Sequence, residues 1–342
     1  MGNILFICGS LNQTTQMHAI ARNLMDDHSC YFTPYYGDGI VNLFAKMGWL
    51  DFTVLGGRHK RETVEYLCHH NLNLDLRGES HPYDLVVTCS DLLIQNNIRD
   101  KRIVLVQEGI TEPEGLMFHL VKWLKLPRYL ANTSTNGLSN EYDMFCVASR
   151  GYANLFIRKG VKKEKISVTG IPNFDNIKTA RENNFQIRGH VLAVTSPLRE
   201  TFRFDDRRNF IRKCNTIAGD RNLVFKLHPL EDVKRARREI NQYAPGALVF
   251  AYGNVNPMIA NAEVVITQQS TSTYVALALE KEVYTNLNVE ELKCLMPIQN
   301  DGASAEYIAR ICDRTLHTPL NILLAKRKQT QPRLTQKRAD AF

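Results

Sequence analysis

Two polar stretches in the second half of the chain carry the side chains best suited to chemistry. The first is Lys226-Leu227-His228-Pro229, which follows the apolar run 222–225; the second begins at Gln268, after the apolar run 262–266. The second stretch continues into four consecutive hydroxyl residues at the start of a predicted helix, namely Ser270, Thr271, Ser272 and Thr273. Because ligands of open α/β sheets bind at the carboxyl ends of the strands, both stretches are expected to face one crevice and to bind a phosphate group.

Each stretch has a chemical role in this interpretation. An imidazole is charged or neutral near pH 7, so His228 can stabilise or protonate a departing phosphate, while Pro229 fixes the backbone and ends the strand. The hydroxyl run is longer than a helix cap requires, and the amides of a helix N-terminus attract anions. Ser196 and Arg199, in the loop after the run 191–195, are weaker phosphate candidates. The alternatives are a surface histidine at the start of a loop and simple helix capping.

The first half of the chain offers a candidate general base. Glu108, in Gln107-Glu108-Gly109, follows the strand-like run 102–106, and a glycine there allows close approach of a substrate. An ordinary turn acid is the alternative interpretation, and Glu112 and Glu114 are weaker candidates for the base. The polar loop 9–15, which contains Gly9, Ser10 and Gln13, is predicted to contact the acceptor of the reaction.

Several common sites are missing from the sequence. It contains no G-x-x-x-x-G-K-[ST] phosphate loop, no G-x-S-x-G nucleophile motif and no Asp-x-Asp motif. His69, His70 and His81 do not have the spacing of metal ligands. The eight cysteines are scattered without a C-x-x-C pair, which favours reduced, buried thiols over a zinc site. The sequence therefore predicts chemistry that needs no metal and no cofactor.

Strand-like and helix-like segments alternate throughout the chain, which predicts parallel βαβ units. The second series of strands begins after the break at 170–177, and the helix 303–314 is predicted to close it. We therefore expect an α/β protein with an N-terminal Rossmann-like domain over 1–172 and a C-terminal one over 173–325, whose parallel sheets face a central cleft. Within the first domain, 52–55 is expected to form a short strand, and Phe118 and Trp123 of the helix 116–124 are expected to point inward.

The composition predicts a cytoplasmic protein with an anionic partner. The chain has 342 residues with a net charge of +8, and no apolar run approaches the length of a membrane span. The N-terminus lacks the features of a signal peptide. Basic residues of 326–342 lie in a polar segment that is expected to be a disordered tail, either merely solvated or in contact with an anionic membrane surface. A nucleic-acid partner is not expected, since no motif for one is present.

The motifs together resemble those of GT-B glycosyltransferases. In particular, Gln107-Glu108-Gly109, His228-Pro229 and the run 270–273 are similar to the acidic, His-Pro and serine motifs of bacterial sialyltransferases, with Gln107 in place of the first acid. Kdo transferases of capsule and lipopolysaccharide assembly and CDP-glycerol glycerophosphotransferases share the pattern. The segment 170–175, Gly-Ile-Pro-Asn-Phe-Asp, is similar to the segment that leads into the second domain of the glycerophosphotransferases and of UDP-GlcNAc 2-epimerases.

The resemblance implies a glycosyltransferase of bacterial surface-polysaccharide biosynthesis. In such an enzyme Glu108 would deprotonate the acceptor hydroxyl of a glycan or lipid-linked acceptor. His228 would assist the departing phosphate of a nucleotide-activated donor, and the hydroxyls would bind that phosphate. The resemblance favours a CMP- or CDP-linked donor. Two alternatives stay open, namely a UDP-GlcNAc 2-epimerase-like isomerase and a non-catalytic module that binds a nucleotide or sugar.

Overall fold

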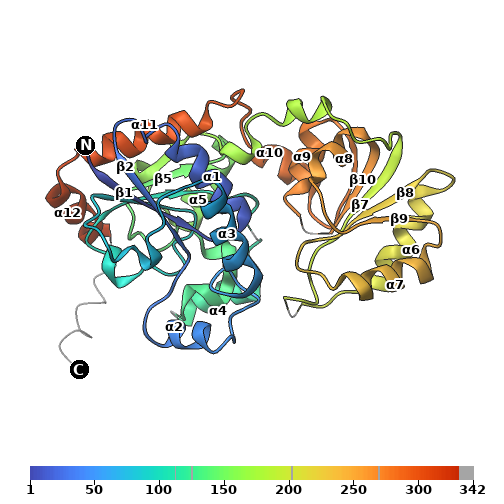
Figure 1. The fold of residues 1–342 in the computed structure, drawn as a ribbon, viewed down its shortest axis with the longest axis horizontal. Helices are drawn as coiled ribbons and strands as arrows, with labels where there is room; N and C mark the ends of the chain where they lie inside the picture. The colour runs from blue at the N-terminus through green and yellow to red at the C-terminus, as the bar shows by residue number, and fades with distance from the viewer. Residues whose placement is uncertain (112, 125, 202, 269, 331–342) are drawn as a thin grey trace. The chain divides into compact units, whose positions relative to one another are not determined.

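The computed structural model describes residues 1–111, 113–124, 126–201, 203–268 and 270–330. The chain divides into two compact units (Figure 1): unit 1 comprises Met1–Asp175 and the chain from Asn300 onward, and unit 2 comprises Asn176–Gln299. Each unit is built on its own parallel sheet with helices packed against it. The α/β class with two Rossmann-like sheets that was expected from the alternating pattern is thus confirmed.

Unit 1 contains a parallel sheet with the strand order β2-β1-β3-β4-β5-β6. Its strands read as nearly continuous apolar runs because a parallel sheet is covered on both faces. In spatial order they are β2 (Ser29–Pro34), β1 (Asn3–Cys8), β3 (Leu85–Thr88), β4 (Arg102–Val106), β5 (Met144–Val147) and β6 (Ile166–Val168). Every neighbouring pair is parallel, so the carboxyl ends of all six strands lie along one edge of the sheet.

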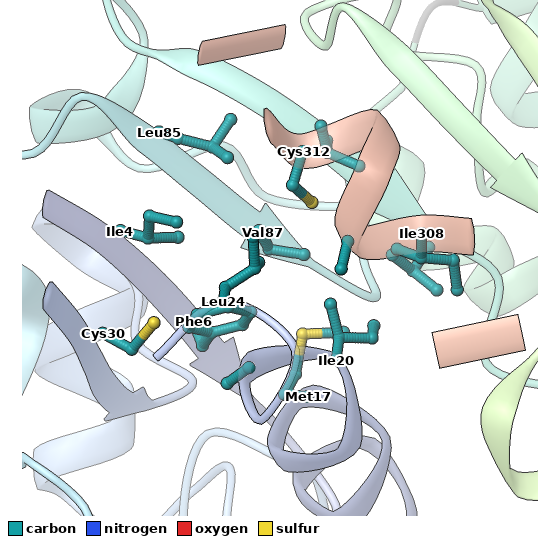
Figure 2. Packing of buried hydrophobic residues seen from close by; sticks show 14 of the residues in the cluster. Ile4, Phe6, Met17, Ile20, Leu24, Cys30, Leu85, Val87, Ile308 and Cys312 are labelled. Atoms are coloured by element: carbon teal, nitrogen blue, oxygen red, sulfur yellow. The ribbon is translucent and has the colours of Figure 1, made fainter. Parts of the chain in front are cut away.

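Unit 1 also contains α-helices, several of which pack against this sheet. They are α1 (Leu11–Ala21), α2 (Gly39–Lys46), α3 (Gly57–His69), α4 (Leu116–Leu124), α5 (Arg150–Lys159), α11 (Ser304–His317) and α12 (Leu320–Thr330). Short 3-10 helices connect them: η1 (Leu76–Gly78), η2 (Asn96–Ile98), η3 (Arg128–Thr135), η4 (Lys163–Lys165) and η5 (Pro172–Phe174). In the core, Phe6 of β1 and Met17 of α1 belong to the same buried cluster as Ile308 and Cys312 of α11 (Figure 2).

The placement of α11 corrects the expected domain boundary. The stretch 300–325 was assigned to the second domain, yet Ile308 and Cys312 are fully buried against the sheet of unit 1. The chain leaves unit 1 after Asp175 and re-enters it at Asn300. At this point the Asp175 carboxylate accepts hydrogen bonds from the Asn300 and Ser304 amides, each at 2.6 Å. The apolar face of α11 therefore completes the core of the first unit and not that of the second.

The start of the expected disordered tail, 326–330, is helical instead. Helix α12 extends to Thr330, and Arg327 within it is buried. The Arg327 guanidinium forms an ion pair with the buried Asp143 carboxylate, with 2.7 Å between Nε and Oδ1, and it also donates to the Arg99 and Lys101 carbonyls. The sequence pattern missed this contact because a lone arginine in a basic segment does not reveal a distant acid. The remaining tail, 331–342, lies outside the described residues.

Unit 2 contains a parallel sheet with the order β11-β10-β7-β8-β9. Its strands are β11 (Glu282–Tyr284), β10 (Ala262–Thr267), β7 (His190–Val194), β8 (Leu223–Lys226) and β9 (Leu248–Phe250). Its helices are α6 (Arg207–Ala218), α7 (Val233–Tyr243), α8 (Val255–Asn261), α9 (Ser272–Ala278) and α10 (Val289–Leu295), with the 3-10 helix η6 (Ile177–Arg181). The buried cluster that joins β7, β8 and β10 to α6 and α7 forms the core.

Two local predictions in unit 1 are wrong. Residues 52–55 form a turn, not a strand, because the Thr53 hydroxyl donates to the Leu50 carbonyl and closes the backbone locally. In α4, Phe118 is buried but Trp123 is 80% exposed. The two residues are five positions apart, which places their side chains on different faces of a helix with 3.6 residues per turn. Among the described residues, no helix has the length and apolar character to cross a membrane.

Candidate functional site

The sheet of unit 2 brings together the three polar loops predicted from the sequence. Strand β7 lies between β10 and β8, with Val194 opposite both Thr267 and Lys226. The loops that begin at Thr195, Leu227 and Gln268 therefore leave adjacent carboxyl ends of parallel strands. This is the edge at which open α/β sheets bind ligands, as the sequence pattern predicted.

His228 is held in a defined orientation at this edge. Its backbone amide donates to Glu231 Oε2 at 2.7 Å and to Thr195 Oγ1 at 3.1 Å. Its ring Nδ1 accepts a hydrogen bond from the Leu230 amide at 3.2 Å. Because Nδ1 is an acceptor, the neutral ring carries its proton on Nε2, which is then the donor of the imidazole. The neighbouring Pro229 is exposed.

A buried ion pair that the sequence did not reveal supports this loop. Glu231 accepts a hydrogen bond from the Thr195 hydroxyl and pairs with the Arg207 guanidinium of α6, and both charged side chains are 5% exposed. Arg207 thus offsets the charge of a carboxylate that would otherwise be buried alone. The spacing of His228 and Glu231, three residues apart, was the available signal. The same spacing occurs in many ordinary turns, so it is a weak indication of an ion pair.

Lys226 and Arg199 make contacts that indicate structural roles. The buried Lys226 ammonium donates to the Leu227 carbonyl at 2.8 Å and to the Ala251 carbonyl at 3.4 Å. Arg199 donates to both carboxylate oxygens of Glu239, at 2.8 and 2.6 Å. The hydrogen bonds that Arg199 donates to Glu239 raise the pKa of Arg199 above its ordinary value and lower the pKa of Glu239. The phosphate contacts predicted for these two cations therefore find no support in their geometry.

The hydroxyl run divides between the interior and the surface. Helix α9 begins at Ser272, and the buried Thr273 hydroxyl shares a hydrogen bond of 2.9 Å with the Thr267 hydroxyl. Ser270 Oγ accepts a hydrogen bond from the Ser272 amide at 3.2 Å. The Thr271 side chain is exposed and makes no capping hydrogen bond. Thr271 is therefore exposed and Ser272 half-buried at the start of α9, whereas the Thr273 hydroxyl stabilises the turn. Gln269 lies outside the described residues.

In unit 1, the predicted base and the predicted acceptor loop form one cluster. Glu108 follows β4, and residues 9–13 follow β1, with β3 between the two strands; the loop predicted over 9–15 is wrong beyond Ser10, because α1 begins at Leu11. Glu108 Oε1 accepts hydrogen bonds from Ser10 Oγ at 3.0 Å and from Asn12 Nδ2 at 3.4 Å, and Oε2 accepts one from Gln13 Nε2 at 2.6 Å. The carboxylate is half-buried and oriented by three donors from the N-cap and first turn of α1.

Gly9 and Gln107 explain why this cluster has its form. A Cβ atom on Gly9 would overlap Oε1 of Gln13 and lie 2.8 Å from its Cδ. The Gln107 side chain is buried; it donates to the Gly109 carbonyl at 2.8 Å and accepts from the Ala148 amide at 2.9 Å. An acid at this position could not donate to Gly109 when ionised. Gln107 is therefore suited to a structural role beside Glu108.

Two residues near Glu108 were missed by sequence reasoning. Burial lowers the pKa of His59, on α3, and the carboxylates of Glu62 and Glu108 act in the opposite direction. Asn173 donates from Nδ2 to the Asn12 carbonyl and to Asn12 Oδ1, both at 2.7 Å. Asn173 belongs to the Gly-Ile-Pro-Asn segment noted in the sequence, but nothing in the pattern singled out His59. The alternative base Glu114 is exposed, and Glu112 lies outside the described residues.

A cavity of about 430 Å³ lies beside the carboxyl end of β2 in unit 1. Its lining includes Tyr36, Asn42 and Lys46 of the segment after β2, together with Lys60 and Arg77. It shares α3 with the Glu108 cluster, since Lys60 follows His59 directly. Among the described residues, no three His, Cys, Asp or Glu side chains are grouped so that they could hold a metal ion. A reaction without a metal stays a prediction.

Comparisons with known proteins identify the fold. No protein-family model matches the chain, and no curated protein matches it by sequence. Its structure is similar to UDP-GlcNAc 2-epimerase from Neisseria meningitidis bound to UDP-GlcNAc, with a TM-score of 0.57 and 11% identity over 91% of this chain and 100% of that one. A putative UDP-N-acetylglucosamine 2-epimerase from Listeria monocytogenes is similar with a TM-score of 0.55 and 12% identity. The match covers 93% of this chain and 98% of that one. A variant of the wall teichoic acid polymerase TagF is similar with a TM-score of 0.51 and 12% identity. The match covers 92% of this chain and 89% of that one.

At these identities the similarity shows the fold alone. It confirms that the two Rossmann-like units follow the GT-B type of architecture that the motifs implied. The finer resemblance to sialyltransferases and Kdo transferases stays a prediction.

Proposed function

We propose that this chain is a metal-independent glycosyltransferase. It moves a sugar or related group from a nucleotide-activated donor to a glycan or lipid-linked acceptor in bacterial surface-polysaccharide biosynthesis, in the cytoplasm. The observation that carries the proposal is the difference between the two clusters. The cluster of unit 1 centres on the oriented carboxylate of Glu108, whereas in unit 2 His228 and the hydroxyl residues 270–272 follow strands whose carboxyl ends lie on one edge of the sheet.

The cluster of unit 2 suits the leaving group. As the bond between the sugar carbon and the phosphate oxygen breaks, the phosphate takes the electron pair and gains negative charge. The Nε2 proton of His228 and the hydroxyls of Thr271 and Ser272 are groups that stabilise such charge by hydrogen bonding. The Glu231–Arg207 pair keeps the His228 loop in place, so that little reorganisation is needed during the reaction.

The cluster of unit 1 suits activation of the acceptor. A hydroxyl that attacks the sugar carbon must lose its proton, and Glu108 is the carboxylate that receives it. Ser10, Asn12 and Gln13 orient the carboxylate, and these polar side chains are also the groups best placed to contact an acceptor hydroxyl. The motif resemblance favours a CMP- or CDP-linked donor over a UDP-linked one.

A 2-epimerase-like isomerase is the second candidate. It is favoured by the fold similarity to the Neisseria meningitidis enzyme, which covers all of that chain. An epimerase needs no acceptor, so incubation with UDP-GlcNAc alone separates the two functions. Conversion of UDP-GlcNAc without an acceptor would replace the transferase proposal.

The proposal is tested by nucleotide binding and turnover in matched variants. A ligand that binds the folded state raises its melting temperature, so CMP, CDP, UDP and GDP are compared by thermal shift. His228→Ala is expected to reduce the shift given by the preferred nucleotide. Glu108→Gln is expected to keep that shift but to lower turnover by about 100-fold or more.

Glu114→Gln is the matched control, because Glu114 is an exposed acid near Glu108 in the sequence. It is expected to leave both measurements unchanged. If Glu114→Gln abolished turnover and Glu108→Gln did not, Glu108 would not be the base. If no nucleotide shifted the melting temperature, the donor assignment would be wrong.

A further inference from the structure

Unit 1 carries exposed apolar side chains on α2, on α4 and on the segments that follow them. We define the apolar face by the residues Ile40, Leu43, Met47, Trp49, Leu116, Met117, Trp123, Leu124, Leu126, Tyr129 and Leu130, each exposed. The chain contains two tryptophans, and both belong to this face, with exposed fractions of 61% for Trp49 and 80% for Trp123. In Figure 1, α2 and α4 are drawn at the same end of unit 1.

These side chains contribute little to the core of unit 1. Helix α2 has no buried residue, although it is apolar except for Asn42 and Lys46. Helix α4 buries Phe118 and Val121 and leaves its other apolar residues outside the core. Scattered exposed apolar residues are ordinary, but a concentration of them with exposed tryptophans marks an interaction site. The face therefore requires an apolar partner.

The charges on the two helices identify the kind of partner. Lys46 and Lys122 are exposed, and neither α2 nor α4 contains an Asp or Glu. The acids that flank α2 are engaged with the protein: Asp38 accepts from the Asn96 amide at 2.6 Å, and Asp51 accepts from the Gly57 amide at 2.9 Å. The helices themselves thus carry two lysines and no carboxylate, which complements an anionic surface, while the exposed Glu114 lies before the start of α4.

The combination of residue types favours lipid over a protein partner. Lysine is depleted at the cores of protein interfaces. At a bilayer surface, by contrast, its stem lies along the apolar layer while its ammonium reaches the headgroups. Tryptophan and tyrosine are enriched at the same depth of a bilayer. Amphipathic helices with these features lie in the plane of the membrane interface.

We propose that the apolar face docks unit 1 onto an anionic lipid bilayer, with Trp49 and Trp123 inserted at the headgroup level. This surface is distinct from the basic tail that the sequence suggested, and it does not depend on which reaction the protein catalyses. Contact through such a face would keep the protein peripheral.

The two tryptophans make the docking directly measurable. The full chain is mixed with vesicles of phosphatidylglycerol and, separately, of phosphatidylcholine, and its intrinsic fluorescence is recorded. We expect a blue shift with phosphatidylglycerol that weakens as salt is added. Trp49→Phe leaves Trp123 as the reporter, and Trp123→Phe leaves Trp49. Both variants are expected to shift, because both helices dock. A shift in neither, at millimolar lipid, would overturn the proposal, and a shift in one alone would restrict docking to one helix and so overturn the two-helix face.

Vesicle sedimentation tests the surface independently. Leu43→Asp combined with Trp123→Asp is expected to lower the bound fraction at least tenfold, while Tyr252→Asp, at a 73% exposed aromatic of unit 2, leaves it unchanged. A chain that ends at Thr330 is expected to bind like the full chain. If removal of 331–342 abolished binding and the double variant did not, the tail would be the anchor. A blue shift that depends on protein concentration without vesicles would instead identify the face as a contact between two copies of the chain.

Discussion

At the scale of single residues, the cluster around Glu108 depends on the lack of a side chain at Gly9. Gln13 Nε2 reaches Glu108 Oε2 at 2.6 Å by crossing the space beside Gly9. A Cβ atom at position 9 would occupy that space and force the Gln13 amide to move. The orientation of the proposed base is thus set partly by a glycine whose backbone has no unusual conformation.

Gly9→Ala is expected to lower activity while leaving the fold intact. The clash is with the end of a flexible side chain, so the free energy of unfolding should change by about 1 kcal/mol or less. The loss of the Gln13 hydrogen bond should lower kcat through the misplaced carboxylate, and the thermal shift given by nucleotide should be retained. Steady-state kinetics and nucleotide-dependent melting check this.

Gly115→Ala is the matched control, since a Cβ on Gly115 meets no atom within 4 Å and its φ is ordinary. It should leave kcat unchanged. Equal kinetics for Gly9→Ala and Gly115→Ala would show that the Gln13 contact does not position Glu108.

At the scale of secondary structure elements, the single residue Arg327 connects the C-terminal helix α12 to the core of unit 1. Helix α12 contains Lys326, Arg327 and Lys328, which by composition alone indicate a solvated segment. Arg327 is nevertheless buried against Asp143, whose Oδ2 also accepts from the Ile103 amide at 2.9 Å. A single ion pair therefore connects the last described helix to β4 and to the start of β5.

Arg327→Met is expected to destabilise unit 1 substantially. Removing one partner of a buried ion pair leaves the other charge uncompensated, at a cost of about 3 kcal/mol or more. The comparison is Arg310→Met, which removes an exposed pair with Glu306 that should contribute only about 0.5 kcal/mol. Urea denaturation measures both. Adding Asp143→Asn to Arg327→Met should recover part of the loss, because the buried charge is then removed.

If Arg327→Met cost no more than Arg310→Met, α12 would not be docked in solution. The original expectation of a tail that is disordered from residue 326 would then hold.

At the scale of the whole molecule, the two units have separate cores and different numbers of histidines. Unit 2 contains two of the ten histidines, His190 and His228. His190, at the start of β7, is fully buried, and burial lowers its pKa from 6.5 to about 4. The stability of unit 2 should therefore depend on pH through a residue that lies outside the proposed site.

The free energy of unfolding is expected to fall as the pH is lowered from 6.5 toward 4. In that range the unfolded chain binds a proton at His190 that the folded chain does not bind, so acid favours unfolding. The contribution is fully present above pH 6.5, and below about pH 4 both states are protonated and the loss stops. Thermal melts across this range measure the effect.

His190→Leu should flatten the pH dependence between 6.5 and 4, whatever its effect on stability at neutral pH. His69→Gln, at an exposed position of unit 1, should leave the slope unchanged. An unchanged slope in His190→Leu would mean that His190 is not the group responsible.

The sequence alone determined the class of the fold and the places where chemistry is proposed. Alternating apolar runs and helical segments predict parallel sheets because both faces of such sheets must be covered. Glu108 and His228 were found because polar residues directly after buried strands must lie at the carboxyl edge. Local patterns of this kind are readable because they depend on neighbours in the chain.

Only the tertiary structure decided which side chains have partners and where the chain re-enters unit 1. Lys226 and Arg199 looked like phosphate ligands, yet carbonyls and the Glu239 carboxylate hold them. The contacts of Arg327 with Asp143, of Glu108 with Gln13 and of α11 with β3 join residues far apart in sequence. No local pattern reports such pairs, because a charge or an apolar face is compatible with many partners until packing brings one of them within reach.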